Sequence, residues 1–276
     1  MKIGFIDYYL DEWHANNYPA WIREASGGEA EVCYAFGLID SPLSGMTSAQ
    51  WCEKFGVELC GTIEEVVEKS DVLVVLSPDN CEMHEQLCQI PLRSGKPTYV
   101  DKTFAPDAQT ARRIFAIAEE HGTPCYSSSA LRFAEEYRGI DPGKVKAVSC
   151  WGPNTYETYS IHQLEPLMML MKAPAKRVLY LKGDQWLTLA VEFVDGRTGT
   201  ITQFADGSPF VTNIAYEGEN KLVTVESDFF AAFIKEMIDF FRTKEPKVPH
   251  QETIDIMAVR EAGLKAQNCP GEWVPV

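Results

Sequence analysis

The feature that most constrains the fold is an unbroken apolar run in the first half of the chain, Val72-Leu73-Val74-Val75-Leu76. A strand that is apolar at every position is typical of a parallel sheet covered on both faces. Further short strand-like runs lie at 2–6, 31–36, 96–100 and 123–126. Amphipathic stretches separate these runs, at 19–25, 48–55, 62–69, 81–94 and 107–121. The alternation predicts an α/β domain over residues 1–125, built on a Rossmann-type doubly wound parallel sheet.

The remaining residues, 126–276, follow a different pattern. Strand-like runs joined by turn signals indicate two hairpins, at 187–204 and 210–226. Three helical segments are expected, at 160–171, 228–243 and 251–266. This order predicts a smaller α+β domain for substrate binding and dimerisation, with an open antiparallel sheet and helices on one face. We expect the last helix to pack back on the first domain.

Composition excludes several classes of partner. The chain has 25 Lys and Arg against 40 Asp and Glu, a formal charge of −15, which repels phosphate backbones and anionic lipids. We therefore expect neither a nucleic-acid nor a membrane partner. The eight cysteines form no C-x-x-C pair and no tight Cys/His cluster. This pattern predicts free thiols in a reducing cytoplasm and no metal site, and the first residues resemble a strand rather than a targeting segment.

The loop after the first strand lacks the glycines of a dinucleotide-binding protein. Such proteins carry G-x-G-x-x-G there, because the backbone must approach the pyrophosphate closely. This chain has Asp7, Tyr9 and Glu12 at the three glycine positions. A carboxylate ~4–5 Å from a phosphate costs a few kcal/mol. The sequence therefore predicts weak pyrophosphate binding beside Asp7 and Tyr9.

The segment that follows is rich in hydrogen-bonding and stacking groups. Pro19 suits the first position of a helix, which predicts a long loop over Tyr8–Tyr18. Long loops at the carboxyl end of a strand often bind ligands, so Trp13 and His14 are candidate substrate-binding residues. The alternative is a structural loop whose tryptophan fills a gap in the core.

Two later loops carry a family resemblance. Ser77-Pro78 to His84 is similar to T-P-x-x-x-H, and Asp101-Lys102-Thr103 to E-K-P, two motifs of the Gfo/Idh/MocA family of glucose–fructose oxidoreductases and inositol dehydrogenases. Asp and Thr here replace the family's Glu and Pro. The resemblance implies that Ser77, Pro78, His84 and Asp101 contact a cofactor. For His84 the favoured alternative is a capping or packing role.

The second half of the chain resembles the same family. The family motif D-x-G-x-H-x-x-D is similar to the stretch from Thr158 to Glu165, with Thr158 replacing the first acid. The resemblance implies that His162 is the base and that Lys102 holds the reacting hydroxyl. His162 and Glu165 are three residues apart and share one helical face. Tyr159, Glu165 and Arg132 are the further candidate substrate-binding residues, because they are expected near Lys102 and His162 in one cleft.

The resemblance implies an NAD- or NADP-dependent oxidoreductase that acts on a sugar, cyclitol or related polyol. The missing glycines favour an alternative, a relative that has lost dinucleotide binding and serves as a small-ligand binding or regulatory protein. A third possibility keeps the cofactor through the Tyr8–Tyr18 segment. The choice between NAD and NADP stays open, because only the distant Asp40 follows the second strand as a partner for the ribose.

One strand of the second domain predicts an oligomer. Leu187, Leu189, Val191 and Phe193 alternate with less apolar residues, so one face of the strand is markedly apolar. Because helices cover only one side of an open sheet, we expect a homodimer or higher homo-oligomer that pairs sheet against sheet.

Overall fold

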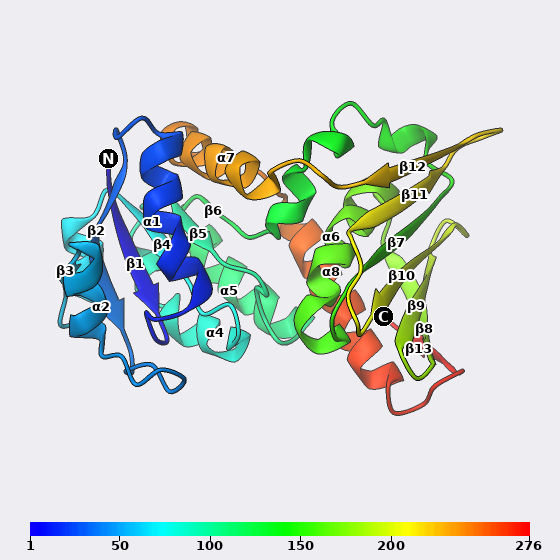
Figure 1. The fold of residues 1–276 in the computed structure, drawn as a ribbon, viewed down its shortest axis with the longest axis horizontal. Coiled ribbons are helices and arrows are strands. Elements are labelled where there is room, and N and C mark those ends of the chain that lie inside the picture. Colours follow the sequence, from blue (N-terminus) through cyan, green and yellow to red (C-terminus); the bar gives the residue numbers. More distant parts are fainter. The chain divides into compact units, whose positions relative to one another are not determined.

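The computed structural model describes residues 1–276 and divides into two compact units. Unit 1 consists of Met1–Ser128 and Phe233–His250, and unit 2 of Ser129–Ala232 and Gln251–Val276. Figure 1 draws both as ribbons and labels most of their helices and strands. Each unit has its own sheet, as the sequence pattern predicts.

Unit 1 is built on a six-stranded parallel sheet in the order β3-β2-β1-β4-β5-β6. This is the strand order of a doubly wound dinucleotide-binding fold, so the predicted Rossmann-type architecture is confirmed. The strands are β1 (Lys2–Asp7), β2 (Glu31–Gly37), β3 (Glu58–Leu59), β4 (Val72–Val75), β5 (Thr98–Val100) and β6 (Cys125–Tyr126). The helices before residue 128 are α1 (Trp13–Ala25), α2 (Ser48–Phe55), α3 (Ile63–Lys69), α4 (His84–Leu87) and α5 (Ala108–Glu120).

The helices pack tightly on the sheet. A Cβ at Gly4 of β1 would lie 2.4 Å from Val66 Cγ1 of α3, so only glycine fits there. Every residue of β4 is buried, as its apolar run predicts. The short strand β3 was not expected, because both of its residues are exposed and it has no apolar run.

Helix α1 begins earlier than the sequence suggests. The prediction that Pro19 opens this helix and that Tyr8–Tyr18 is a loop is wrong, since α1 starts at Trp13 with Pro19 in its interior. The Glu12 side chain accepts hydrogen bonds from the backbone N–H groups of His14 and Ala15. This carboxylate cap sets the start of the helix, and Pro19 removes only one donor further along.

The helix that completes unit 1 is α7 (Phe229–Thr243), from Phe233 onward, rather than the last helix. The Phe233 ring lies 5.9 Å from the ring of Tyr18 and 5.2 Å from that of Tyr99. The Phe240 ring lies 4.8 Å from that of Tyr126. This aromatic face has its partners on unit 1, whereas all but the first residue of α8 (His250–Ala266) belongs to unit 2.

Unit 2 contains a seven-stranded sheet in the order β12-β11-β7-β10-β9-β8-β13. Its strands are β7 (Ala147–Pro153), β8 (Ala175–Lys182), β9 (Trp186–Phe193), β10 (Thr198–Phe204), β11 (Val211–Ala215), β12 (Asn220–Thr224) and β13 (Trp273–Pro275). The sheet is mixed rather than purely antiparallel, because β10 runs parallel to β7. Helix α6 (Tyr156–Met171) returns the chain from the end of β7, and the antiparallel run β8-β9-β10 then brings β10 beside β7 in the same direction.

Helices α6 and α8 lie together in unit 2. The Tyr156 hydroxyl of α6 donates to the Arg260 carbonyl of α8 at 3.3 Å. A Cβ at Gly199 would lie 2.5 Å from Leu167 Cδ1, so α6 packs directly on β10. None of the helices is both long and apolar enough to span a membrane.

The strongly apolar face of β9 is covered within the chain. Leu189, Val191 and Phe193 are fully buried, so the expectation that this face needs a second subunit is wrong. Its alternate residues lie on the opposite face, where Trp186 of β9 and Trp151 of β7 are both more than 40 % exposed.

Candidate functional site

The carboxyl edge of the unit 1 sheet brings ionisable residues together. Strand β1 ends at Asp7, and Ser77 follows β4 after one residue. Asp101 and Lys102 follow β5 directly. The register aligns Ile6 with Val75 and Val75 with Val100, so all three strands end at the same level. Doubly wound sheets bind their ligands at this edge.

His14 and Asp101 form a buried pair at this edge. The Asp101 carboxylate bonds to His14 Nδ1, and its other oxygen accepts from the Tyr99 hydroxyl at 3.2 Å. Burial tends to raise the pKa of Asp101, but the electrostatic attraction and hydrogen bond of the His14 ring and the charge of Lys102 hold it below its usual value. The His14 ring stacks on that of Tyr18, with centroids 5.1 Å apart. Asp101 is therefore ionised at neutral pH and fixes the orientation of the imidazole.

Two further carboxyl groups lie nearby. Asp7 is 1 % exposed, and neither of its carboxyl oxygens makes a hydrogen bond. Burial and the neighbouring Glu12 raise the pKa of Asp7 well above its usual value. Burial raises the pKa of Glu12 to about 8, although its bonds to the amides of Ala15 and His14 favour the ionised form. Both carboxyls therefore hold protons at pH values where exposed acids are ionised.

These residues do not fit the pyrophosphate of a dinucleotide bound in the usual way. That mode requires free N–H groups at the start of α1. Here Glu12 takes the N–H groups of His14 and Ala15, and the Glu12 carbonyl takes that of Asn16. The Tyr9 side chain, in place of a glycine, is buried beside them. The predicted loss of the phosphate cradle therefore has a concrete form, because the chain's own carboxylate occupies the amides.

The loops after β4 and β5 are joined by His84. Its ring is fully buried, with Nε2 2.7 Å from the Leu76 carbonyl and Nδ1 2.9 Å from the Phe104 carbonyl. Burial lowers the pKa of His84, while the two carbonyls act in the opposite direction. Both nitrogens are engaged within the protein, so the ring holds the two loops together.

Ser77 and Pro78 form the turn after β4. Ser77 is buried, has a φ of +96°, and its hydroxyl donates to the Asn80 carbonyl at 3.0 Å. Pro78 is half-buried beside it. The contacts of Ser77, Pro78, Asp101 and His84 with a cofactor stay predictions.

In unit 2, His162 lies on α6 with its ring among aromatic residues. Ser129 Oγ bonds to His162 Nδ1 at 2.7 Å. The rings of Tyr159 and Phe210 lie 5.1 and 5.9 Å away, both tilted by more than 60°. Tyr159 was expected near His162 and lies beside it. Lys102 belongs to unit 1 and His162 to unit 2, so their convergence on one cleft stays a prediction.

Glu165 and Arg132 pair with each other. The Arg132 guanidinium lies 3.0 Å from the Glu165 carboxylate and also contacts Glu252, which Lys172 binds at 2.6 Å. Burial raises the pKa of Glu165 to about 7, and Arg132 limits the rise. Glu165 also accepts from the Ser129 backbone N–H at 3.0 Å. These side chains support the segment that bears Ser129, and their contact with a substrate stays a prediction.

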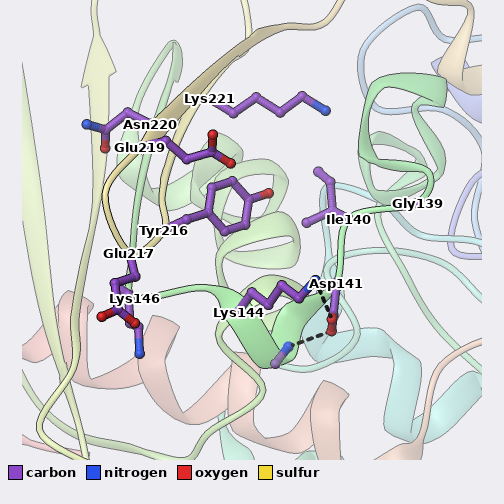
Figure 2. Close-up of a pocket in the computed structure, with 11 residues that line it drawn as sticks. Gly139, Ile140, Asp141, Lys144, Lys146, Tyr216, Glu217, Glu219, Asn220 and Lys221 are labelled. Carbon is purple, nitrogen blue, oxygen red and sulfur yellow. Dashed lines mark hydrogen bonds and ion pairs between the residues drawn. The ribbon is translucent and has the colours of Figure 1, made fainter.

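A separate pocket of about 810 Å³ lies in unit 2, lined by the turn around Asp141 and the turn between β11 and β12. Figure 2 shows lysine and acidic side chains from both turns around it. Asp141 accepts from the Gly143 backbone N–H at 3.0 Å, and Lys144 Nζ lies 4.0 Å away. None of the predicted site residues lines this pocket.

Sequence analysis did not identify four residues that take part in these contacts. They are Tyr99, Ser129, Glu252 and, in its role as the helix cap, Glu12. Glutamate is not among the preferred N-cap residues, and Ser129 stands in a run of three serines that carries no positional signal. Trp13 is 52 % exposed, with its ring 5.2 Å from that of His14, so it does not fill a gap in the core.

Sequence comparison identifies part of unit 1. Residues 35–128 match the Gfo/Idh/MocA model, described as an oxidoreductase family with an NAD-binding Rossmann fold. The match begins within β2, so β1 and all of α1 lie outside it. A 109-residue segment is 28 % identical to dTDP-3,4-didehydro-2,6-dideoxy-alpha-D-glucose 3-reductase of Actinomadura kijaniata, and covers 37 % of this chain but 31 % of that relative. The resemblance to this family is thereby confirmed.

Solved structures extend the likeness in fold to the whole chain. A probable dehydrogenase from Thermotoga maritima is 12 % identical, with a TM-score of 0.81 over 100 % of this chain and 98 % of that one. Myo-inositol dehydrogenase from Lactobacillus casei, in complex with NAD(H) and myo-inositol, is 14 % identical, with a TM-score of 0.81 over 100 % of this chain and 96 % of that one. The fold is therefore shared over both units.

The capping carboxyl predicts a pH-dependent stability. Because the pKa of Glu12 is raised from 4.5 to about 8 in the folded protein, stability is lost as pH rises through this window. Glu12→Gln keeps an oxygen for the cap and cannot ionise. Between pH 5 and pH 9 the free energy of unfolding should fall on the order of 3 kcal/mol further in the unaltered protein than in the variant.

Urea unfolding at both pH values measures the difference. Glu64→Gln, on an exposed residue in the first turn of α3, is the matched control and should follow the unaltered protein. Parallel pH profiles for Glu12→Gln and the unaltered protein would contradict the buried, protonated state of Glu12.

Proposed function

We propose that this chain, with its Gfo/Idh/MocA-type first unit, is an oxidoreductase that acts on a sugar, cyclitol or related polyol, with NAD or NADP as the cofactor. The observation that carries the proposal is the placement of two residues. Lys102 directly follows β5 inside the matched segment, and His162 lies on α6 with its Nδ1 bonded to Ser129. The substrate class is supported by the similar proteins, whose names specify inositols and a deoxysugar.

In this proposal, His162 removes the proton of the reacting hydroxyl. The Ser129 hydroxyl bonded to Nδ1 fixes the orientation of the ring for this proton transfer. Lys102 holds the substrate oxygen and stabilises the negative charge that develops on it. Glu165 and Arg132 keep Ser129 in position, and Tyr159 lies against the His162 ring.

Removal of either group should abolish most turnover. Lys102→Met and His162→Gln should each lower kcat about 10²-fold or more, because each removes proton transfer or charge stabilisation. Production of NADH or NADPH from myo-inositol, scyllo-inositol and D-glucose measures the effect. Lys144→Met and His121→Gln, on exposed residues, should keep full turnover. Equal activity of the Lys102 and His162 variants and the unaltered protein would contradict the assignment.

A second candidate function is a relative that binds a small ligand or regulates without a dinucleotide. One observation favours it, because Glu12 caps α1 with the carboxylate that stands where a pyrophosphate would bind. The buried Asp7 adds a second side chain at a position where dinucleotide-binding proteins carry glycine. The third possibility, cofactor binding through residues 8–18, now involves the first turn of α1 and not a loop.

A titration separates these candidates. We expect NADH and NADPH to bind with a dissociation constant above ~100 μM, because Glu12 occupies the N–H groups of His14 and Ala15 and the loss of a few kcal/mol of phosphate contacts weakens binding ~10²-fold or more. Asp7→Gly should tighten binding by removing the buried carboxyl. Isothermal calorimetry of the purified protein measures both. Sub-micromolar binding of NADH by the unaltered protein would eliminate the dinucleotide-free candidate.

We also propose a homodimer formed through the open face of the unit 2 sheet. The apolar face of β9 is already covered, but the open face exposes Trp151 and Trp186, with Phe204 beside Trp151. Light scattering at micromolar concentration should give twice the chain mass of 31.0 kDa, and Trp186→Asp should give the monomer. A monomer for the unaltered protein would contradict the proposal. We also propose a cytoplasmic location, because all eight cysteines are free thiols, which are typical of a reducing compartment.

A further inference from the structure

The pair formed by His14 and Asp101 has the arrangement of a catalytic base and its orienting acid. Asp101 is fully buried, and Tyr99 donates to its second oxygen at 3.2 Å. A carboxylate accepts hydrogen bonds, so the His14 nitrogen that faces it, Nδ1, carries the proton. The lone pair of the imidazole is thereby placed on Nε2, as in the histidine of a serine protease triad.

The rest of the environment holds the His14 ring in place and leaves Nε2 available. The ring stacks on Tyr18 with an interplanar angle of 16°. It also makes an edge contact with the Trp13 ring, with the two ring centroids 5.2 Å apart. The backbone N–H of His14 is bonded to Glu12 at 2.7 Å. No residue of the chain hydrogen-bonds to Nε2 of His14. A base that is fixed at one nitrogen and unoccupied at the other is ready to exchange a proton with a ligand.

Charge limits the ligand that this edge of the sheet can accept. The N–H groups of His14 and Ala15 at the start of α1 are bonded to Glu12, so they are not available to a phosphate. Lys102, adjacent to Asp101, supplies positive charge there. The ammonium group of Lys102 suits a carbonyl oxygen that becomes negative during reaction. The ligand that fits is a neutral, unphosphorylated polyhydroxy aldehyde or ketone.

We propose that His14 catalyses the enolisation of a neutral polyhydroxy aldehyde or ketone at the carboxyl edge of the unit 1 sheet, without a dinucleotide. Nε2 takes a proton from the carbon next to the carbonyl. The electron pair of that C–H bond forms a C=C bond, and the carbonyl π pair moves to oxygen, where Lys102 stabilises the charge. The protonated His14 then returns the proton to the same carbon, and the electron pair on oxygen reforms the carbonyl, so no oxidant or reductant is consumed. Asp101 is the positioning residue, and the inference is independent of the proposed oxidoreductase activity.

Exchange with heavy water tests the chemistry. The full chain, free of added NAD(P), is incubated in D2O with dihydroxyacetone or D-fructose, and proton NMR follows the loss of the signal next to the carbonyl. The unaltered protein should accelerate exchange of at least one probe. His14→Gln should lower the rate at least 10²-fold, and added imidazole should restore part of the rate to His14→Gly. His121→Gln, on an exposed residue, should keep the full rate.

The role of Asp101 requires its own measurement. In nitrogen-15 NMR, His14 of the unaltered protein should show a proton on Nδ1, and Asp101→Asn should abolish that preference and lower the exchange rate about tenfold or more. Tyr99→Phe, which removes the hydroxyl that bonds to Asp101 and to the Ser128 carbonyl, should retain the tautomer and serves as the control for loss of a buried hydrogen bond.

Three results would overturn the inference: no exchange of either probe by the unaltered protein, exchange that survives His14→Gln, or a His14 tautomer with its proton on Nε2. The oxidoreductase proposal fails separately, through absence of NAD(P)-linked turnover in the same preparations, and that failure leaves the exchange result unaffected.

Discussion

The hydrogen bonds between the Glu12 carboxylate and the first amides of α1 determine how the edge of the unit 1 sheet is used. They start the helix at Trp13, so His14 falls in its first turn and reaches Asp101 after β5. They also occupy the N–H groups that a Rossmann fold ordinarily offers to a phosphate. One side chain thus closes the usual cofactor position and establishes a buried network of ionisable groups in its place.

Much of the fold follows from the sequence because hydrophobic periodicity reports burial. The unbroken apolar run at β4 predicts a sheet covered on both faces, and all its residues are buried. Two features escaped the pattern. Amphipathicity identified the helix at 228–243 but gives no information about which sheet receives its aromatic face. The relative direction of two neighbouring strands depends on the segments that connect them. The parallel pairing of β7 with β10 was therefore not predictable from the sequence of either strand.

The candidate site was predictable residue by residue but not as a set of partners. Because Asp7, Asp101 and Lys102 lie at the ends of predicted strands, they were expected at one edge of the sheet, and the register of the strands places them there. The family motifs pointed to His84, Arg132 and Glu165 as site residues. In the structure these side chains bond mainly to other groups of the protein, because buried polar groups need hydrogen-bond partners. The pairing of His14 with Asp101 spans 87 positions, and no local spacing encodes it.

Helix α7 gives the chain an unusual order of assembly. The backbone passes between the units at Ser128, at Ala232 and at His250, so neither unit is one continuous stretch of sequence. On a ribosome, the residues up to Ser128 emerge while the aromatic face around Tyr18 and Tyr99 still lacks Phe233. At 5–20 residues per second, that face waits on the order of ten seconds for its cover. A chain truncated after residue 128 would lack this cover permanently, because Phe233 and Phe240 lie beyond that point.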